Sequence, residues 1–210
     1  MPIADPLYPV NLVLDGRPCL VVGGGAVAAR KAAGLVDAGA DVTVVAPRVG
    51  EGVRQLPVRW EERPYRRGEV AAYWLALAAT DDPATNAAVR ADGDAAKVWV
   101  NAADDVSSCS FILPAVVRQP PLMVTIATGG HSPALASWLK EHVAAEMGGE
   151  WATLAAMLSA ARERLGASGR STESADWRAV IGWDMLELLR SGQDDIVKER
   201  LQAWLSSSLD

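Results

Sequence analysis

The sequence predicts an α/β protein in which a parallel sheet covered by helices is followed by a small α+β region and a helical tail. Over the first hundred residues, strand-like apolar runs alternate with helical segments, as in doubly wound sheets. Two further apolar runs, 111–117 and 122–127, are separated by a short turn, which favours an antiparallel pair. From Trp151 onward the apolar pattern is helical. We therefore expect three parts, at residues 1–112, 113–147 and 148–210.

The composition is that of a globular protein and excludes several functional classes. Of 210 residues, 50 % are hydrophobic and 22 % are charged, with a net charge of −6. This acidic balance disfavours a nucleic-acid partner. No uncharged apolar run reaches the 18 or so residues that span a bilayer, and the first ten residues lack a secretion-signal pattern. We therefore expect no membrane partner. Because Cys19 and Cys109 make no disulfide framework, we also expect a cytoplasmic protein.

The first structural unit that we expect is a strand, a helix and a second strand. Residues 19–22 form an apolar run typical of a buried parallel strand, and three glycines follow it. The alanine-rich segment 26–38 predicts a helix that ends at Gly39. The β-branched run 41–46 predicts the second strand.

The alternation continues less regularly along the chain. A helix is expected from Pro83, which suits a first helical turn, to about Asp92. Another helix is expected over residues 133–147, ending at two glycines. Further short strands are expected at 58–60, 73–79 and 98–100. Two apolar helix faces are expected in the tail, one with Trp151, Leu154, Leu158 and Ala161, the other with Trp183, Leu186 and Leu189.

The glycine-rich turn after the first strand matches the dinucleotide fingerprint G-x-G-x-x-G/A as Gly23-x-Gly25-x-x-Ala28. Gly23 permits the tight turn, Gly25 lets a diphosphate approach the backbone, and Ala28 allows close packing of helix on strand. The N–H groups and the dipole at the helix start would face the phosphates. A merely structural turn is the alternative, but the surrounding strand–helix–strand pattern favours a Rossmann-type dinucleotide-binding domain.

The position that usually selects the cofactor departs from the fingerprint. An acidic residue normally ends the second strand and holds the ribose hydroxyls. Here Pro47 and Arg48 follow that strand. Arg48 would either meet the 2′-phosphate of NADP or be an ordinary surface arginine, so physical reasoning leaves NAD and NADP open.

Polar segments follow two of the other expected strands, where ligands bind in open α/β sheets. They are 80–82 and 101–105. Asp104 and Asp105 are adjacent and point to opposite sides of an extended chain, so one could serve as a general base or metal ligand while the other is solvated. A polar turn is the alternative. His131 lies in a Gly-Gly-His-Ser-Pro turn, either as a ligand or as a loop residue. Because no metal-ligand spacing appears, no metal site is predicted.

Six motifs follow one another along the chain. They are Val21-Val22-Gly23-Gly24-Gly25-x-Val27-Ala28-x-Arg30-Lys31, Ala78-Ala79-Thr80-Asp81-Asp82, Asn101-x-x-Asp104, Cys109-Ser110-Phe111-Ile112-x-Pro114, Pro121-Leu122-x-Val124 and Gly129-Gly130-x-Ser132-Pro133-x-Leu135-Ala136. Taken together, in this order and spacing, they resemble the precorrin-2 dehydrogenase family, the NAD-dependent module of sirohaem synthases. The resemblance spans about residues 7–147, and no methyltransferase segment is found, so the stand-alone form is expected.

The resemblance implies a reaction and its residues. Precorrin-2 loses a hydride to NAD and a proton to a base, which gives sirohydrochlorin. Asp104 of the N-x-x-D motif is implied as the catalytic residue. NAD contacts are implied for Gly23, Gly25, Ala26, Val27, Pro47, Arg48 and Thr80. The carboxylates of a tetrapyrrole substrate need donors, and the candidates are Asn101, Arg118, Lys140 and the turn with Gly130, His131 and Ser132. For Arg118 and Lys140, an ordinary solvated surface position is the alternative.

The resemblance also implies a homodimer formed through about residues 113–147. Some members of the family insert ferrous iron into the product to make sirohaem, and the sequence leaves that second activity open. Two other functions compete with the dehydrogenase. One is a chelatase that keeps the dinucleotide fold as a scaffold, and the other is a non-enzymatic NAD-binding redox sensor.

Overall fold

The computed structural model describes residues 7–103, 109–173 and 175–209. They divide into two compact units. The first contains the chain up to Leu113 together with Ala127–Pro133, and the second contains Pro114–Ile126 and the chain from Ala134 onward. The division of the second unit into a dimerisation region and a separate tail stays a prediction.

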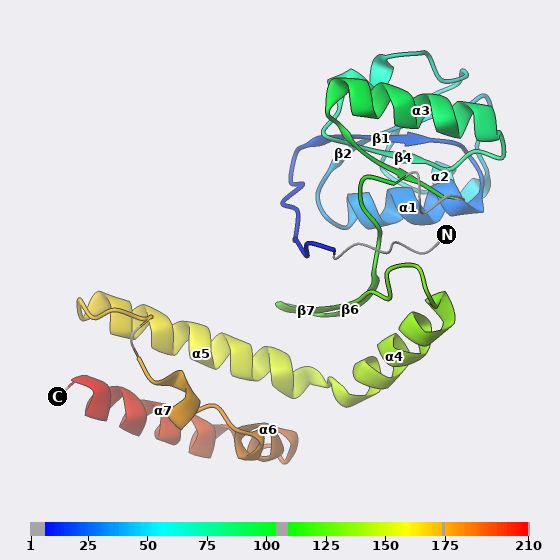
Figure 1. Cartoon of the computed structure of the whole chain (residues 1–210). Helices are drawn as coiled ribbons and strands as arrows, with labels where there is room; N and C mark the ends of the chain where they lie inside the picture. The colour runs from blue at the N-terminus through cyan, green and yellow to red at the C-terminus, as the bar shows by residue number, and fades with distance from the viewer. Residues whose placement is uncertain (1–6, 104–108, 174, 210) are drawn as a thin grey trace. The chain divides into compact units, whose positions relative to one another are not determined.

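The first unit is built on a five-stranded parallel sheet in the order β3-β2-β1-β4-β5 (Figure 1). Val22 at the end of β1 pairs with Val45 on β2 and with Ala78 on β4, so the carboxyl ends of these strands meet at one edge. The strands are β1 (Pro18–Val22), β2 (Asp41–Val45), β3 (Arg59–Glu61), β4 (Leu75–Ala78) and β5 (Trp99–Ala102).

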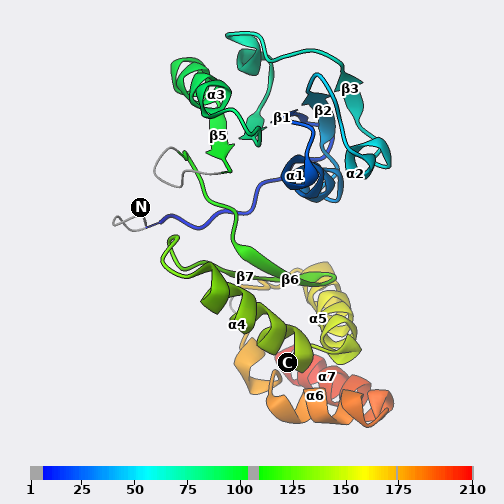
Figure 2. The same cartoon turned by 90° about the vertical axis from the view of Figure 1, so that its right-hand side faces the viewer.

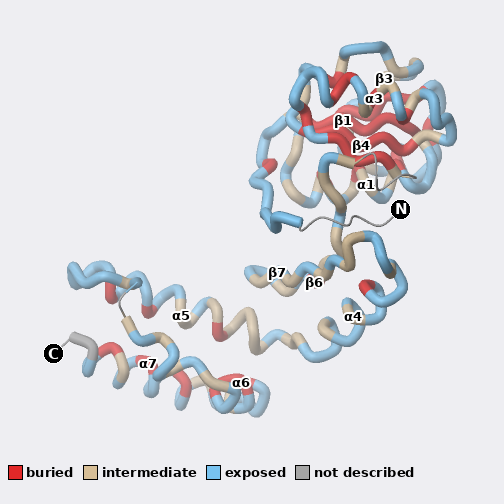
Figure 3. Tube along the Cα trace, viewed as in Figure 1, coloured by how far each residue is buried: buried red, intermediate tan, exposed pale blue. Residues whose placement is uncertain are grey.

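Helices cover both faces of this sheet, as Figure 2 shows for α1 and α3. One face packs against α1 (Ala26–Val36) and α2 (Glu51–Arg54). The other packs against α3 (Pro83–Ala96) and the 3₁₀ turn η1 (Glu69–Ala72). The buried residues concentrate in the strands between these layers (Figure 3). The predicted α/β class with a Rossmann-type domain is therefore confirmed.

Helix α3 runs one turn past its predicted end near Asp92 and stops at Ala96. Gly93 would be a poor choice in an exposed helix, but here it is buried against β5. A Cβ at Gly93 would overlap the side chain of Val100. The glycine therefore marks a close helix–strand contact and not a helix end.

The second unit begins with an antiparallel hairpin of β6 (Ala115–Gln119) and β7 (Leu122–Ile126), as the two apolar runs predict. The first of these strands starts four residues later than predicted, because Phe111 packs against the core of the first unit. The helices are α4 (Pro133–Glu146), α5 (Gly149–Ala167), α6 (Trp183–Arg190) and α7 (Asp194–Leu209), with a 3₁₀ turn η3 (Trp177–Ala179).

The three last helices share a core that includes Leu154 and Leu201. On α6 the buried stripe is Met185, Leu186 and Leu189, and Trp183 lies off it with 72 % of its surface exposed. The expectation that Trp183 shares the buried face is therefore wrong, because Trp183 is the first residue of α6 and its ring meets edge-on the ring of Trp151, which is itself only partly buried. Among the described helices, none has the length and apolar character needed to cross a membrane.

Candidate dinucleotide site

The glycine turn joins β1 to α1 at the carboxyl edge of the sheet, and two of its glycines are needed for packing. Gly23 has a φ of 125°, which side chains rarely adopt, and a Cβ there would overlap the carbonyl oxygen of Ala79. A Cβ on Gly24 would overlap the carbonyl of Arg48, and the N–H of Gly50 donates to Gly24 O at 2.8 Å. The turn thus fits tightly between the loops that follow β2 and β4.

Gly25 faces open space. An added Cβ would have no described atom within 4 Å, and its φ of −82° is open to any residue. No described side chain caps this end of α1, where the first helical bond is donated by Ala29 N to Gly25 O at 3.0 Å. The N–H groups of the first turn are therefore available, and Ala26 and Val27 are exposed beside them. This cradle fits the diphosphate of a dinucleotide.

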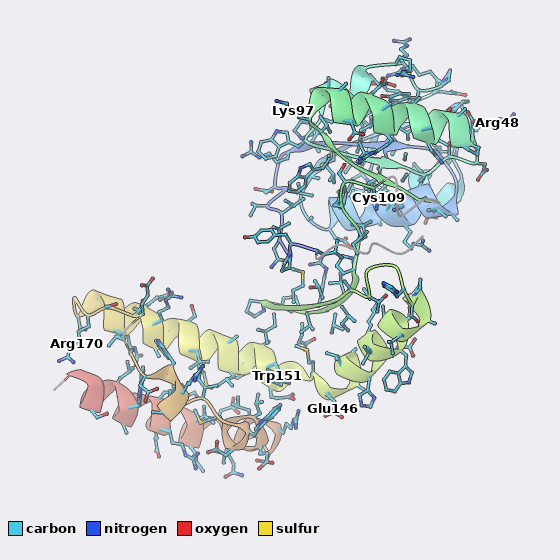
Figure 4. The ribbon with its side chains drawn as sticks, in the orientation of Figure 1. Arg48, Lys97, Cys109, Glu146, Trp151 and Arg170 are labelled. Carbon is cyan, nitrogen blue, oxygen red and sulfur yellow. The ribbon has the colours of Figure 1, made fainter. Side chains whose placement is uncertain are left out.

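Pro47 and Arg48 follow β2 and are exposed beside this cradle. Figure 4 shows Arg48 and Lys97 at opposite ends of the first unit, which places Arg48 at the carboxyl edge with the glycine turn. Sequence reasoning assigned no role to Gly24, although a third consecutive glycine was the available signal. Its contact with the Arg48 backbone connects the two segments that are expected to bind the cofactor.

Thr80 lies at the end of β4, with its backbone nitrogen 3.1 Å from a Cβ built on Gly23. The hydroxyl is used within its own turn, 2.9 Å from Asn86 Oδ1 and 3.2 Å from the N–H of Asp82. Asp82 caps α3 by accepting from the hydroxyl and N–H of Thr85 and the N–H of Ala84, which lowers its pKa. Thr80 therefore shapes the edge of the cradle mainly through its backbone.

Asn101 is 6 % exposed, and both ends of its amide are engaged inside the protein. Its Oδ1 accepts from Lys31 Nζ at 2.5 Å, and its Nδ2 donates to the carbonyl of Phe111 at 3.0 Å. These contacts favour a positioning role over the predicted contact with substrate. Sequence reasoning gave Lys31 no role, although a lysine between Ala28 and Leu35 on the buried face of α1 was a usable signal.

Cys109 is partly buried and contacts both backbone groups of Ala102, with its Sγ 3.2 Å from the N and 3.3 Å from the O. It also packs against the core of the first unit as a partly buried small residue. The other thiol, Cys19, is buried in the sheet, and burial raises its pKa to about 11. A thiol in this state is unreactive near neutral pH.

The remaining predicted substrate residues fall into both units. Gly130, His131 and Ser132 form a turn grouped with the first unit, in which Ser132 N donates to the Thr128 hydroxyl at 3.1 Å and His131 is exposed. Arg118 lies on β6 in the second unit and is exposed, with Nη1 3.3 Å from Met123 Sδ.

The predicted catalytic residue Asp104 and its neighbour Asp105 lie outside the described residues. Within the part of the chain that is described, no group of three or more His, Cys, Asp or Glu side chains could hold a metal ion.

Comparison with known proteins adds a family, homologues and a structural neighbour. Residues 10–115 match the family described as "Putative NAD(P)-binding". The chain is 36 % identical over 184 residues to Siroheme synthase 3 of Aeromonas hydrophila, covering 85 % of this chain and 39 % of that protein. It is 41 % identical over 157 residues to the siroheme synthase of Tolumonas auensis, covering 68 % and 33 %. The chain thus spans about two fifths or less of these relatives.

A solved structure named SirC, precorrin-2 dehydrogenase, resembles the whole chain. The two share a TM-score of 0.66 and 26 % sequence identity, over 96 % of this chain and 98 % of the other. The likeness therefore extends beyond the sheet to the hairpin and the helical tail.

Proposed function

The chain belongs to the NAD(P)-binding family that residues 10–115 match, and from this premise we propose that it is an NAD-dependent precorrin-2 dehydrogenase of sirohaem biosynthesis. The observation that carries the proposal is the cradle at Gly25, open in front of an uncapped helix start. The likeness to the solved precorrin-2 dehydrogenase and to the siroheme synthases supports the choice of substrate.

The chain's own residues would bind and orient the cofactor. The first-turn N–H groups of α1 would hold the diphosphate, while Pro47 and Arg48 would border the adenosine end and Thr80 the edge after β4. When bound, NAD supplies a hydride acceptor. We take NAD rather than NADP because of the family resemblance, since Arg48 fits either cofactor.

Oxidation of precorrin-2 to sirohydrochlorin removes two hydrogens, one as hydride and one as a proton. The proton needs a base, and a carboxylate beyond a sheet strand can accept it. We propose Asp104 for this role. Arg118 and the turn at Gly130, His131 and Ser132 are proposed to donate to the substrate's carboxylates.

Two further assignments belong to the same proposal. The protein is a homodimer, and it acts in the cytoplasm. Ferrous iron would be the substrate of a second reaction, its insertion into sirohydrochlorin, which a separate assay tests.

Calorimetric titration with NAD and NADP, followed by an assay on precorrin-2, tests the proposal. We expect NAD binding and formation of sirohydrochlorin. Iron insertion is measured separately, by supplying sirohydrochlorin with ferrous or cobaltous ion. Chelation without oxidation would favour the scaffold chelatase, and NAD binding without either activity would favour a redox sensor.

Replacing Asp104 tests the proposed base. Asp104→Ala should retain NAD binding and lose about 10²–10⁴ in the rate of precorrin-2 oxidation, the usual contribution of a positioned base. Asp105→Ala is the matched control and should change the rate much less. Near-parental turnover by Asp104→Ala would move the search for the base to His131.

A further inference from the structure

Lys31 places a cation at the functional edge of the sheet. It stands on the buried face of α1, between Ala28 and Leu35, and is itself only partly exposed. The helical rise of 1.5 Å per residue puts it about 8 Å along α1 from Ala26, where the diphosphate is proposed to bind. Its ammonium reaches β5, on which Asn101 pairs with Leu77 of β4.

The contact with Asn101 has a defined direction. An ammonium only donates hydrogen bonds, so Lys31 requires the amide to present Oδ1. The amide nitrogen then points the other way, where Phe111 O accepts from it at 3.0 Å. Because Asn101 is buried, loss of the lysine would leave its carbonyl oxygen without this donor in a place that water does not easily reach.

Asn101 is one of several residues that connect the end of β5 with the chain that returns after Cys109. Ser110 N donates to Val100 O at 2.8 Å, and Ser110 Oγ accepts from Val100 N at 3.0 Å. The Sγ of Cys109 likewise contacts both the N–H and the carbonyl oxygen of Ala102. These pairs hold the described chain on either side of residues 104–108, which include Asp104 and lie outside the described residues.

We infer that Lys31 is a positioning residue that acts through Asn101 on the two ends of the segment containing Asp104. The inference is supported by the contacts of Asn101 with Lys31 and Phe111. The pairs of Cys109 with Ala102 and of Ser110 with Val100 support it as well. The catalytic consequence rests on the proposed function, whereas the effect on the backbone does not. A misplacement of about 1 Å at a reacting group costs about 100-fold in rate, so the effect should be large.

The experiment compares Lys31→Met with Lys31→Arg. Hydrogen exchange at Ser110 N–H should be about 10-fold faster in Lys31→Met, because β5, whose Val100 O accepts this N–H, is less firmly held. Exchange in β1 should be unchanged. The kcat for precorrin-2 should fall about 10- to 100-fold, while KM and the Kd for NAD stay close to those of the parent. Lys31→Arg keeps a long hydrogen-bond donor, so its exchange rate at Ser110 and its kcat should be close to those of the parent.

Arg30→Met is the matched control, because Arg30 is the neighbouring cation on the exposed face of α1. It should behave like the parent in every measurement. If Lys31→Met does not fold, Lys31→Gln is used, whose amide ends one bond short of the position of Nζ and should give the same pattern.

Parental exchange at Ser110 in Lys31→Met would overturn the inference whatever the reaction is. Parental kcat in that variant, with an active parent, would also overturn it, as would a loss confined to NAD affinity. If the parent itself does not oxidise precorrin-2, the proposed function fails, and the exchange result still decides the positioning role.

Discussion

The three glycines in the turn after β1 occupy their positions for different physical reasons. Gly23 is required by its φ of 125° and by the carbonyl of Ala79, and Gly24 by the backbone of Arg48. Gly25 is required by neither, since it is extended and faces open space. The proposed diphosphate site supplies a reason for glycine at this position, so ligand binding and folding would place separate demands on adjacent residues.

We predict that Gly25→Asp abolishes NAD binding and leaves the protein folded. Aspartate is a favoured helix N-cap and differs from glycine there by only a few tenths of a kcal/mol, so the Tm should hold or rise slightly. Its carboxylate would take the N–H groups that the diphosphate needs and would repel its charge. Calorimetry with NAD and a thermal melt measure the two effects.

Gly23→Ala is the contrasting variant, because its methyl group collides with backbone on β4. It should lower the Tm together with NAD affinity. Normal NAD affinity in Gly25→Asp would remove the cofactor assignment.

Asp92 is a buried carboxylate whose charge should matter for stability. It accepts from Tyr65 Oη at 2.9 Å and Gly68 N at 2.8 Å, and it pairs with Arg67 at 2.6 Å. Burial opposes its ionisation, but the hydrogen bonds from Gly68, Tyr65 and Arg67 outweigh burial and lower its pKa below 3.8. It therefore stabilises the fold above that pH, and the contribution is lost as the pH falls through the lower folded value.

Asp92→Asn should accordingly cost about 1–3 kcal/mol at pH 7, and the difference from the parent should shrink as the pH falls below about 4. Urea unfolding across pH 2–7 measures this. Asp94→Asn is the control, since Asp94 is exposed and its pair with Arg90 should be worth less than about 1 kcal/mol. A pH-independent difference for Asp92→Asn would contradict the role of its charge.

At the scale of elements, close packing of a helix on a strand can outweigh helix propensity, as at Gly93. Gly93→Ala would gain up to about 1 kcal/mol of helix propensity, but its methyl group would collide with Val100, which is fully buried and unable to give way. Overpacking costs about 1–3 kcal/mol, so we predict a net destabilisation of about 1–2 kcal/mol. The midpoint of urea unfolding reports it.

Gly34→Ala supplies the opposite case on α1. This glycine is exposed, and an added Cβ meets no described atom within 4 Å. The substitution should stabilise the protein by up to about 1 kcal/mol. Equal effects from the two glycines would mean that helix propensity, and not the contact with β5, decides at Gly93.

At the scale of the whole molecule, α4 has an exposed apolar face. Of its described residues only Ala136 is buried, and Leu135 and Trp138 lie one turn apart with 48 % and 57 % of their surfaces exposed (Figure 3). Surface tryptophan is enriched at protein interfaces. We predict a homodimer at micromolar concentration that Trp138→Arg weakens, as measured by sedimentation velocity.

Trp183→Arg is the control for this experiment. Trp183 is more exposed than Trp138 but lies on α6 against Trp151, and its replacement should leave the dimer intact. A monomeric parent at micromolar concentration would contradict the homodimer.

The sequence by itself determined the alternating strands and helices, the glycine turn and the family resemblance, which the comparisons confirm. These features are local, because they depend on apolar period, helix caps and turn residues within a few positions of each other. Only the tertiary structure decided why Gly24 and Gly93 are glycines and which end of the Asn101 amide meets Lys31. Those answers depend on atoms brought together from 7 to 70 residues away, and no local pattern encodes such contacts.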